Sequence, residues 1–450
     1  MNLLAILLLM LTAGGVFFAP RRWAVLSFLV GCCYMTVGQG VLIGGLNLPV
    51  IRIILIVGIA RVIIRNEGLA GGINLLDKLV IGWSIWLLFV SFFHIWGPGS
   101  GPKYMSGAIL NTAGFYFMIR SLCRELDELE GIICGLCLIL FPIAVCMLIE
   151  QAARYNIFSI FGGVEEIPTL RHGRYRAQGP FNHAILAGTV GASCLPLAMA
   201  IWRKYRIISI IGIGSSLLMV GACASSGPIL STLFAVTGLL LWYQRRFIVI
   251  GLKVAVPTYF LLSLVMERPP YFLISKIDLT GASSSWHRSF LIQQTIKHLD
   301  EWWLFGTDRT IHWMPNQGFI SSMHTDITNQ YIAYGVAGGL MCLILFIVIL
   351  VLSFRTVWLI SGAERFDIGD RFTFWCVGAS LFAHATSAMS VGYFGQALFF
   401  FWFPVAMLGS FYTIARDEVA VNLHATGEPG PEVESGWPER QRGTQPTWTA

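Results

Sequence analysis

Four arginines in two polar segments have the chemistry to bind an anion together. Arg171, Arg174 and Arg176 lie in the stretch "RHGRYRAQGPFNHA", and Arg288 lies in a second polar segment. A guanidinium group is a planar fork that binds phosphate through paired hydrogen bonds. Such a group also stabilises the charge of a departing diphosphate. These residues therefore favour a transfer reaction in which a diphosphate is bound and released.

Histidines gather in the same two segments. Six of the nine lie in or beside them: His172, His183, His287, His298, His312 and His324. A histidine that titrates near neutral pH can deprotonate or orient an acceptor hydroxyl. We expect His324 to do so. Further candidates for substrate contacts are His183, His312, Asp326 and Asn329. No Asp-x-Asp pair or metal-ligand pattern is visible, so the sequence predicts no metal and no other cofactor.

The composition places these segments in a membrane protein. The 450 residues are 56% hydrophobic and only 12% charged, whereas soluble proteins carry about 25% charged residues. The mean hydropathy is +0.70. A formal net charge of +6 is too small to indicate a nucleic-acid partner. All ten cysteines lie in or beside apolar runs, which predicts small apolar side chains rather than disulfides.

The apolar runs predict an all-α integral membrane bundle with 12 or 13 transmembrane helices. A span needs about 20 apolar residues. The N-terminal run lacks the basic start and the cleavage site of a signal peptide, so we interpret it as the first span. The predicted spans are 2–19, 22–45, 48–65, 77–97, 104–120, 129–150, 184–202, 206–226, 227–243, 247–265, 325–353, 373–391 and 394–414.

Lysine and arginine in alternate short loops predict the orientation of the bundle. They place the N-terminus outside and the C-terminus in the cytoplasm. Two long loops, about 151–183 and 266–323, then lie on the outer, periplasmic side. Residues 1–415 form the transmembrane domain, and 416–450 are expected to be a disordered cytoplasmic tail because they have no apolar period.

The second long loop is expected to contain an amphipathic helix on the outer surface. Ser283 to Ser285 are good N-cap residues. Apolar side chains then recur at helical spacing: Ile292, Ile296, Leu299 and Trp303. Trp302 and Trp303 are expected at the membrane interface. Arg288 lies four residues before Ile292, on the same face, where it meets an anion or extends to a lipid phosphate.

The span after this loop is expected to begin near His324. Asp326, Asn329 and Gln330 have the spacing of residues on one helix face. His324 and Asn329 are five residues apart and would point about 140° apart on a continuous helix. They can share a site only if the helix begins after His324.

Three motifs resemble the O-antigen ligase and polymerase superfamily of bacterial membrane glycosyltransferases. "RAQGPFNHAILA" is similar to that family's Arg-x-x-Gly-x-Phe element. "WHRSFLIQQTIKHLDEWWLFGTD" resembles its arginine helix, which a Pro-Leu-Phe-Gly turn follows. "HTDITNQYIAYGVAGGL" resembles its histidine-asparagine element. The resemblance covers about residues 150–355 and the number of spans. The chain departs from the family at His183-Ala184, where Pro-Asn is frequent, and in the separation of Asn329 from His324.

The resemblance implies an all-helical enzyme that transfers a glycan from undecaprenyl pyrophosphate to a saccharide acceptor. The reaction would take place at the periplasmic face of the bacterial inner membrane. Arg176 and Arg288 would hold the pyrophosphate, and His324 would activate or position the acceptor. Arg171 and Arg174 would join them or only line the entrance, and His183 would join the site or only cap the span.

The departures favour a polymerase of exopolysaccharide or O-antigen repeat units over a ligase that acts on lipid A core. The expected partners are the lipid-linked donor, the saccharide acceptor and the bilayer. The need for a chain-length regulator or export machinery stays open.

A transporter or flippase is the alternative from a different class. It would carry polar residues deep in its spans. Here the candidates are few: Arg52, Arg61 and His384. Polar chemistry concentrates in the outer loops instead, which favours a reaction at the membrane surface over passage through it.

Overall fold

The computed structural model describes residues 1–43, 46–94, 101–171, 173–276, 285–314, 324–364 and 366–425. Helices dominate these ranges. They are α1 (Leu3–Phe18), α2 (Arg21–Tyr34), α3 (Val50–Ile64), α4 (Leu75–Ser91), α5 (Gly101–Ile109), the π-helix η1 (Leu110–Gly114), α6 (Phe115–Leu122), α7 (Leu126–Ala153), η2 (Ile157–Phe161), α8 (Ala184–Ala200), α9 (Arg206–Ala222), α10 (Ser226–Gln244), η3 (Arg245–Phe247), α11 (Ile248–Val265), η4 (Pro270–Lys276), α12 (Ser285–Lys297), α13 (Leu299–Trp302), η5 (Ile311–Trp313), α14 (Gln330–Gly362), α15 (Ile368–Ser387) and α16 (Gln396–Ala425). Two antiparallel hairpins accompany them, β1 (Gly40–Ile43) with β2 (Leu46–Pro49), and β3 (Thr169–Arg171) with β4 (Arg174–Arg176).

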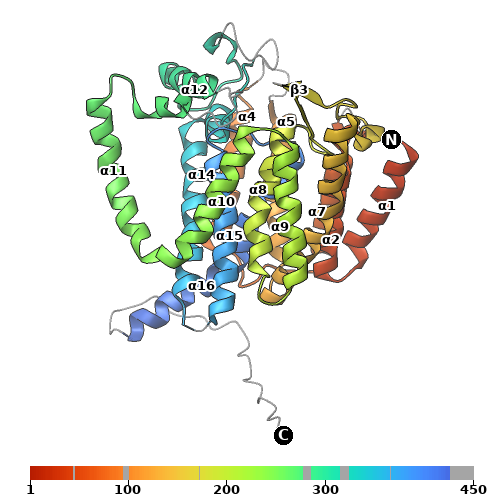
Figure 1. Ribbon diagram of the computed structural model, residues 1–450. Helices are drawn as coiled ribbons and strands as arrows, with labels where there is room; N and C mark the ends of the chain where they lie inside the picture. Colours follow the sequence, from red (N-terminus) through yellow and green to blue (C-terminus); the bar gives the residue numbers. More distant parts are fainter. Residues whose placement is uncertain are drawn as a thin grey trace.

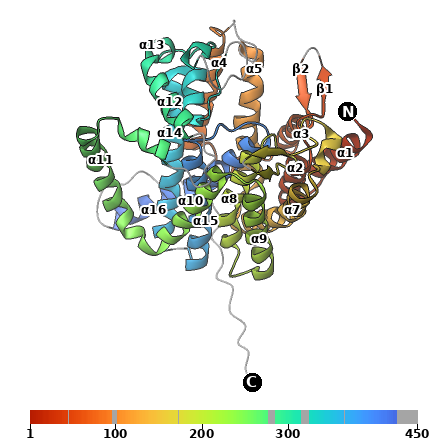
Figure 2. The same cartoon turned by 45° about the horizontal axis from the view of Figure 1, so that its top comes forward.

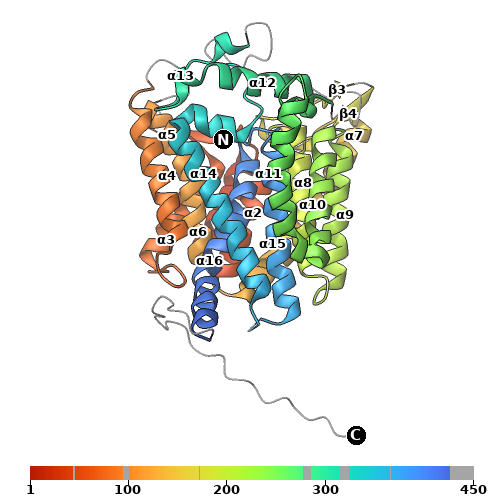
Figure 3. The same cartoon turned by 90° about the vertical axis from the view of Figure 1, so that its left-hand side faces the viewer.

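The long helices stand side by side as a bundle (Figures 1 and 3). We call the end that carries β3, β4 and α12 the loop end, and the opposite end, where α16 leaves the bundle, the tail end. Helices α12 and α13 lie across the loop end, over α14 (Figures 2 and 3). The N-terminus lies at the loop end (Figure 1), so the chain crosses the bundle an odd number of times.

The bundle has the character of an all-helical membrane protein, as the sequence predicts. Within the described ranges, four segments are long and apolar enough to cross a membrane: Leu126–Ala153, Ser226–Gly251, Gln330–Gly362 and Gln396–Ala415. Shorter apolar helices are Leu3–Phe18, Ala184–Ala200, Arg206–Ala222 and Lys253–Val265. Many of their large apolar side chains are exposed, which suits contact with lipid rather than water.

The prediction of one helical span over 22–45 is wrong in its second half. Helix α2 ends at Tyr34, and the β1–β2 hairpin follows, with Val41 opposite Leu48. Glycine interrupts the apolar run here. Gly38 lies so close to the Gly162–Gly163 backbone that an added Cβ would be 2.4 Å from it. Apolar content alone therefore overestimates the length of this helix.

Helix α14 begins later than the sequence predicted. Its first residue is Gln330, and Asn329 caps it, because the Asn329 side chain accepts a hydrogen bond from the Ile332 amide at 3.1 Å. The predicted helix face shared by Asp326, Asn329 and Gln330 is thus wrong, because Asp326 precedes the helix. The geometric objection to a site shared by His324 and Asn329 also disappears, since both lie outside the continuous helix.

A break inside α14 packs against the turn that follows α13. Gly339 has a φ of +74°, so the helical hydrogen bonds stop there. The Leu340 amide donates instead to the Trp303 carbonyl at 2.8 Å, and the Thr307 amide donates to the Val336 carbonyl at 2.8 Å. The backbone groups freed by the break are therefore satisfied by the loop.

The amphipathic helix of the second loop exists, but its buried face differs from the predicted one. Leu291 and Trp302 are buried, whereas Ile296, Leu299 and Trp303 are exposed. Within α12 the buried positions lie one residue before the predicted ones, since Thr295 is buried and Ile296 exposed. The helix then ends at Lys297 and α13 begins a new turn at Leu299, so the helical period does not continue to Trp303. Trp302 packs on α14 and donates to the Thr295 carbonyl at 2.9 Å, so its predicted place at a lipid interface is wrong.

The last helix is longer than predicted. Helix α16 continues to Ala425, so residues 416–425 are helical rather than part of a disordered tail. The rest of that predicted tail, 426–450, lies outside the described residues, as does His172.

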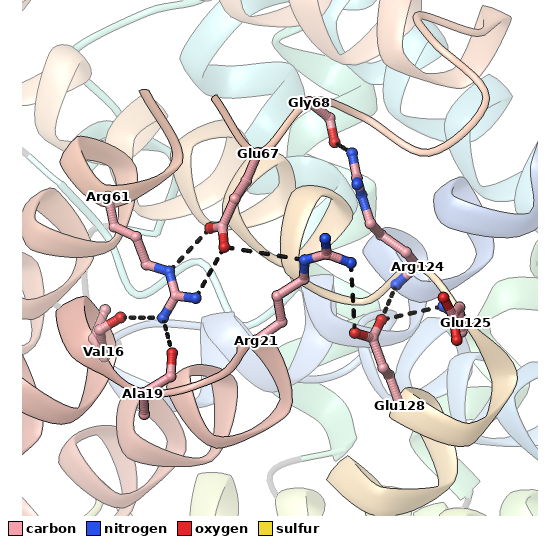
Figure 4. A network of polar contacts seen from close by, with 9 residues as sticks. All are labelled: Val16, Ala19, Arg21, Arg61, Glu67, Gly68, Arg124, Glu125 and Glu128. Atoms are coloured by element: carbon pink, nitrogen blue, oxygen red, sulfur yellow. Dashed lines mark hydrogen bonds and ion pairs between the residues drawn. The ribbon is translucent and has the colours of Figure 1, made fainter. Parts of the chain in front are cut away.

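Arginines at the tail end are paired (Figure 4). Arg61, 1% exposed, donates to both Glu67 oxygens at 2.9 Å and to the carbonyls of α1. Arg21 lies 4.0 Å from Glu67 and 3.7 Å from Glu128. Arg124 donates to the Gly68 carbonyl. Arg61 and Arg21 are thus paired with carboxylates, whereas the Arg124 guanidinium contacts a carbonyl, and its buried Nε has no partner among the described residues.

A second buried pair joins α4 to α6. Arg120 and Asp77 are both fully buried, and their closest N–O distance is 3.2 Å. Asp77 also belongs to a capping box with Asn74 that starts α4, and it accepts from the Tyr116 hydroxyl at 2.7 Å. The carboxylate is thus satisfied on several sides, as a buried charge requires.

Candidate functional site

A buried turn at the loop end positions Arg176. It comprises Gln178, Gly179 and Pro180, between β4 and α8. The Glu150 carboxylate at the end of α7 accepts from the amides of Gln178 and Gly179 at 3.0 and 2.8 Å.

Two side-chain amides complete the support of this turn. Asn156 donates to the Gly179 carbonyl at 2.9 Å, and Gln396 at the start of α16 donates to the Pro180 carbonyl at 2.6 Å. Three parts of the chain therefore hold one turn, which fixes the backbone just after Arg176.

Arg176 points into the protein without a counterion. Its side chain is 6% exposed, and its Nε donates a long hydrogen bond of 3.4 Å to the Cys223 carbonyl at the C-terminus of α9. Its buried Nη2 has no hydrogen-bond partner within the described residues. Burial, and then the charge of Arg171, lower the pKa of Arg176. A helix C-terminus offsets only part of such a charge.

A further arginine of the loop end, Arg288, is carried by α12. It lies in the first turn of that helix and is half-buried. Its Nε is buried and unpartnered within the described ranges. Burial, and then Arg171, lower the pKa of Arg288. Arg171 is thus electrostatically close to both arginines, although more than a hundred residues separate it from Arg288 in the sequence.

The β3–β4 hairpin carries Arg171 and Arg174 directly opposite each other. Like charges that face each other across two strands destabilise the pairing. Both side chains are exposed. The charge of Arg171 lowers the pKa of Arg176 and of Arg288. Arg174 is the exposed arginine opposite it on the hairpin.

His183 both caps α8 and faces the arginines. Its Nδ1 accepts from the Ile185 amide at 3.1 Å. Partial burial of the imidazole, and then the charges of Arg176 and Arg171, lower the pKa of His183 to about 4, although the residue as a whole is exposed. The imidazole is therefore neutral at pH 7. Since Nδ1 accepts, Nε2 carries the proton and is available as a donor.

We call Arg171, Arg176, Arg288 and His183 the arginine cluster. Among the described residues, no salt bridge reaches any of these three arginines. Cations gathered in a partly desolvated place without carboxylates repel one another. An anion with several oxygens would relieve that repulsion and satisfy the buried nitrogens, which a phosphate or diphosphate does well.

His324 has different electrostatic neighbours. It is half-buried in the segment before α14. Burial lowers the pKa of His324, Asp308 opposes that change, and His94 at the end of α4 adds to it. His94 is itself buried and within 2.9 Å of the Phe305 carbonyl through Nε2. We call His324, Asp308 and His94 the histidine group. It is a second polar centre at the loop end.

A contact between α12 and the segment before α14 connects the two centres. His287 Nε2 lies 3.1 Å from the Asp326 carbonyl, and His287 is the neighbour of Arg288 in the arginine cluster. Asp326 is two residues after His324. Burial raises the pKa of the Asp326 carboxyl, and His287 opposes this.

Two predicted substrate contacts have structural partners instead. The Asn329 side chain caps α14 and donates to the Met389 carbonyl at 2.9 Å. His312 lies 2.9 Å from the Glu301 carboxylate, and no contact places it in the arginine cluster. Neither residue is brought to the arginines by the described structure.

Sequence reasoning missed residues that support the site. Glu150 was overlooked although it was a carboxylate at the end of an apolar run, which is by itself a signal of a special role. His94, inside the predicted span 77–97, carried the same signal, whereas Asp308 gave none because it approaches His324 only through folding.

Compared with protein-family models and with curated protein sequences, the chain matches none.

Proposed function

We propose that this chain is a membrane glycosyltransferase that moves a glycan from a polyprenyl-diphosphate carrier to a saccharide acceptor. The preferred reaction is polymerisation of exopolysaccharide or O-antigen repeat units. The observation that carries the proposal is the arginine cluster, where Arg176 and Arg288 each bury a guanidinium nitrogen without a partner among the described residues.

A lipid diphosphate fits the position of the cluster as well as its charge. The cluster lies at the loop end, where His183 caps α8 and Arg288 lies in the first turn of α12. A diphosphate at headgroup depth would keep its polyprenyl tail in the bilayer and its sugar outside. A soluble diphosphate would need no such place beside apolar helices.

The transfer needs two functions, and the two centres supply one each. An acceptor hydroxyl oxygen forms a bond to the anomeric carbon of the donor sugar, while the bond from that carbon to the diphosphate oxygen breaks. The diphosphate leaves with the electron pair, and Arg176 and Arg288 stabilise its charge. His324 takes the proton of the acceptor hydroxyl. Its lowered pKa keeps the imidazole unprotonated and ready to accept.

The proposed topology has thirteen passes in the bacterial inner membrane. They are α1, α2, α3, α4, α5 to α6, α7, α8, α9, α10, α11, α14, α15 and α16. The tail end would face the cytoplasm, since the Lys- and Arg-rich connections lie there. The loop end, with both polar centres, would then face the periplasm.

Transport is less well supported than transfer. Arg61 is engaged by Glu67, Arg52 Nε donates to the Asn111 side chain at 3.2 Å, and His384 Nδ1 lies 3.0 Å from the Tyr393 hydroxyl. These deep polar residues have structural partners, whereas Arg176 and Arg288 retain buried nitrogens without one.

A deletion strain tests the proposal, with accumulated lipid-linked sugars analysed by mass spectrometry. Single repeat units on the carrier are expected if the chain is a polymerase. Finished polymer on the carrier would identify a ligase instead. If neither accumulates on the outer face, transport replaces transfer as the function.

The role of His324 has its own test in the purified protein. We expect His324→Ala to stop glycan transfer, by roughly 10²-fold or more, while donor binding stays within about threefold of the unaltered chain. Arg174→Ala is the control variant, because it removes an exposed polar side chain of the same end of the bundle. Asn329→Ala is unsuitable because it removes the N-cap of α14. Loss of donor affinity in His324→Ala would make His324 a donor contact rather than the base.

A further inference from the structure

Three metal-binding side chains meet at the loop end outside both polar centres. His298 immediately precedes α13, Glu301 lies within it, and His312 belongs to η5. His298 Nδ1 is 2.7 Å from Glu301 Oε1, and His312 Nε2 is 2.9 Å from both Glu301 oxygens. One ligand atom from each residue lies within 4.8 Å of the others.

The spacing of these atoms is close to that of a tetrahedral site. Zinc bonds to histidine nitrogen and carboxylate oxygen are about 2.0–2.2 Å long, which puts neighbouring ligand atoms about 3.4 Å apart. The present separations of His298 and His312 from Glu301, 2.7 and 2.9 Å, need to widen by about 0.7 and 0.5 Å. The side chains of His298, Glu301 and His312 are 20%, 30% and 47% exposed. An ion can therefore enter, and a water can take the fourth position.

Trp313 orients two of the three residues. Its indole Nε1 donates to Glu301 Oε2 at 2.9 Å, and its ring stacks on His298 with 5.7 Å between centroids and 10° between planes. Hydrogen bonds to a ligating carboxylate fix its direction and raise affinity for the ion. Glu301 Oε1, which both histidines approach, remains the oxygen that faces the site.

We propose that His298, Glu301 and His312 bind one divalent transition-metal ion, for which zinc has the best-fitting chemistry. Two imidazole nitrogens and one carboxylate oxygen form a ligand set that zinc takes in proteins, and calcium or magnesium would require more oxygens. The metal site is separate from the arginine cluster. The proposal that it binds an ion does not depend on the proposed transfer reaction.

The ion would fasten the loop between α13 and η5. His298 and Glu301 lie on one side of that loop, and His312 lies eleven residues after Glu301. The fastened segment contains the turn that pairs with the break in α14, as well as Asp308 beside His324. Metal binding would therefore stabilise the surroundings of the histidine group without contacting it.

The test uses the full chain, purified in detergent with any affinity tag removed. We expect isothermal titration with zinc chloride to give one ion per chain, and cobalt(II) to give the visible absorption of a tetrahedral complex. Glu301→Gln and His312→Ala should each weaken zinc binding at least tenfold, and Trp313→Phe should weaken it less. Asp300→Asn removes the adjacent exposed carboxylate and should leave affinity unchanged.

A thermal melt guards against misfolded variants. Zinc should raise the Tm of the unaltered chain and of Asp300→Asn but not of Glu301→Gln, because only a native-state site stabilises the fold. Absence of a saturable zinc or cobalt site in the unaltered chain would overturn the proposal. Equal zinc affinity in the unaltered chain and in folded Glu301→Gln would overturn it as well.

Discussion

The two ends of the bundle treat arginine differently. At the tail end, Arg61 faces Glu67 and Arg120 faces Asp77, with both arginines buried. At the loop end, Arg176 and Arg288 are also buried in part, yet no salt bridge reaches them within the described residues.

This difference separates arginines with carboxylate partners from arginines that we propose bind a ligand. A buried cation is costly unless it is paired. The tail end meets this requirement for Arg61 and Arg120 with its own carboxylates, although Arg120 Nη1 and Arg124 Nε are also buried without a hydrogen-bond partner among the described residues. The loop end leaves it unsatisfied and adds Arg171 on a hairpin where it faces another arginine. Such an arrangement is stable only at a cost in folding free energy, and an anion would remove that cost.

The largest expected effect breaks a pair at the tail end. Asp77→Asn keeps the shape of the side chain but leaves Arg120 buried without a counterion. Loss of one partner of a buried pair costs about 3–5 kcal/mol, so Tm should fall steeply in a thermal melt. Donor affinity of the remaining folded protein should not change. A Tm equal to that of the unaltered chain would show that the pair is not structural.

The next largest effect is expected at the loop end, where substitutions should lower activity rather than stability. Arg176→Ala and Arg288→Ala should each lower polymer formation by about 10²–10³-fold, while Tm stays the same or rises because mutual repulsion is relieved. Lysine in their place should restore activity only in part, since it lacks the paired donors of the guanidinium fork.

Arg174→Ala is the matched control for these two variants. It removes an exposed arginine from the same hairpin as Arg171 and should change polymer formation by less than about threefold. Normal polymer from Arg176→Ala or Arg288→Ala would remove the arginine cluster from the mechanism.

The smallest effect concerns the pH dependence of the histidine group. Asp308 opposes the lowering of the pKa of His324, so Asp308→Asn should lower that pKa further. The acidic limb of the transfer rate should then move to lower pH, because the imidazole stays unprotonated longer on acidification. At pH 7 the rate should change by less than about threefold. A shift to higher pH would contradict the proposed role of Asp308.

The sequence predicted the helical membrane fold, and it singled out the arginines proposed for the site, through simple physical rules. Apolar runs reveal helices in lipid because backbone groups there must pair internally. Arginines in outer loops stand out because cations are normally excluded from that side. The structure then brings Arg171 and Arg288 together across long separations in the sequence.

Other parts of the site depend on long-range contacts that no local pattern encodes. The break at Gly339 is stabilised by the loop around Trp303, and the partners of His324 come from α4 and from the loop after α13. The prediction of the buried face of α12 is wrong by one position, since Leu291 and Thr295 are buried and Ile296 is exposed. A one-residue shift in such a pattern changes which side chains face the protein.

Direct binding of the donor headgroup tests the central claim most closely. The measurement is the affinity of the detergent-purified protein for a polyprenyl diphosphate and for the matching monophosphate. The unaltered chain and Arg174→Ala should prefer the diphosphate, and Arg176→Ala and Arg288→Ala should lose affinity for it by at least tenfold. Equal affinity of all four proteins for the diphosphate would show that the arginine cluster does not bind the donor.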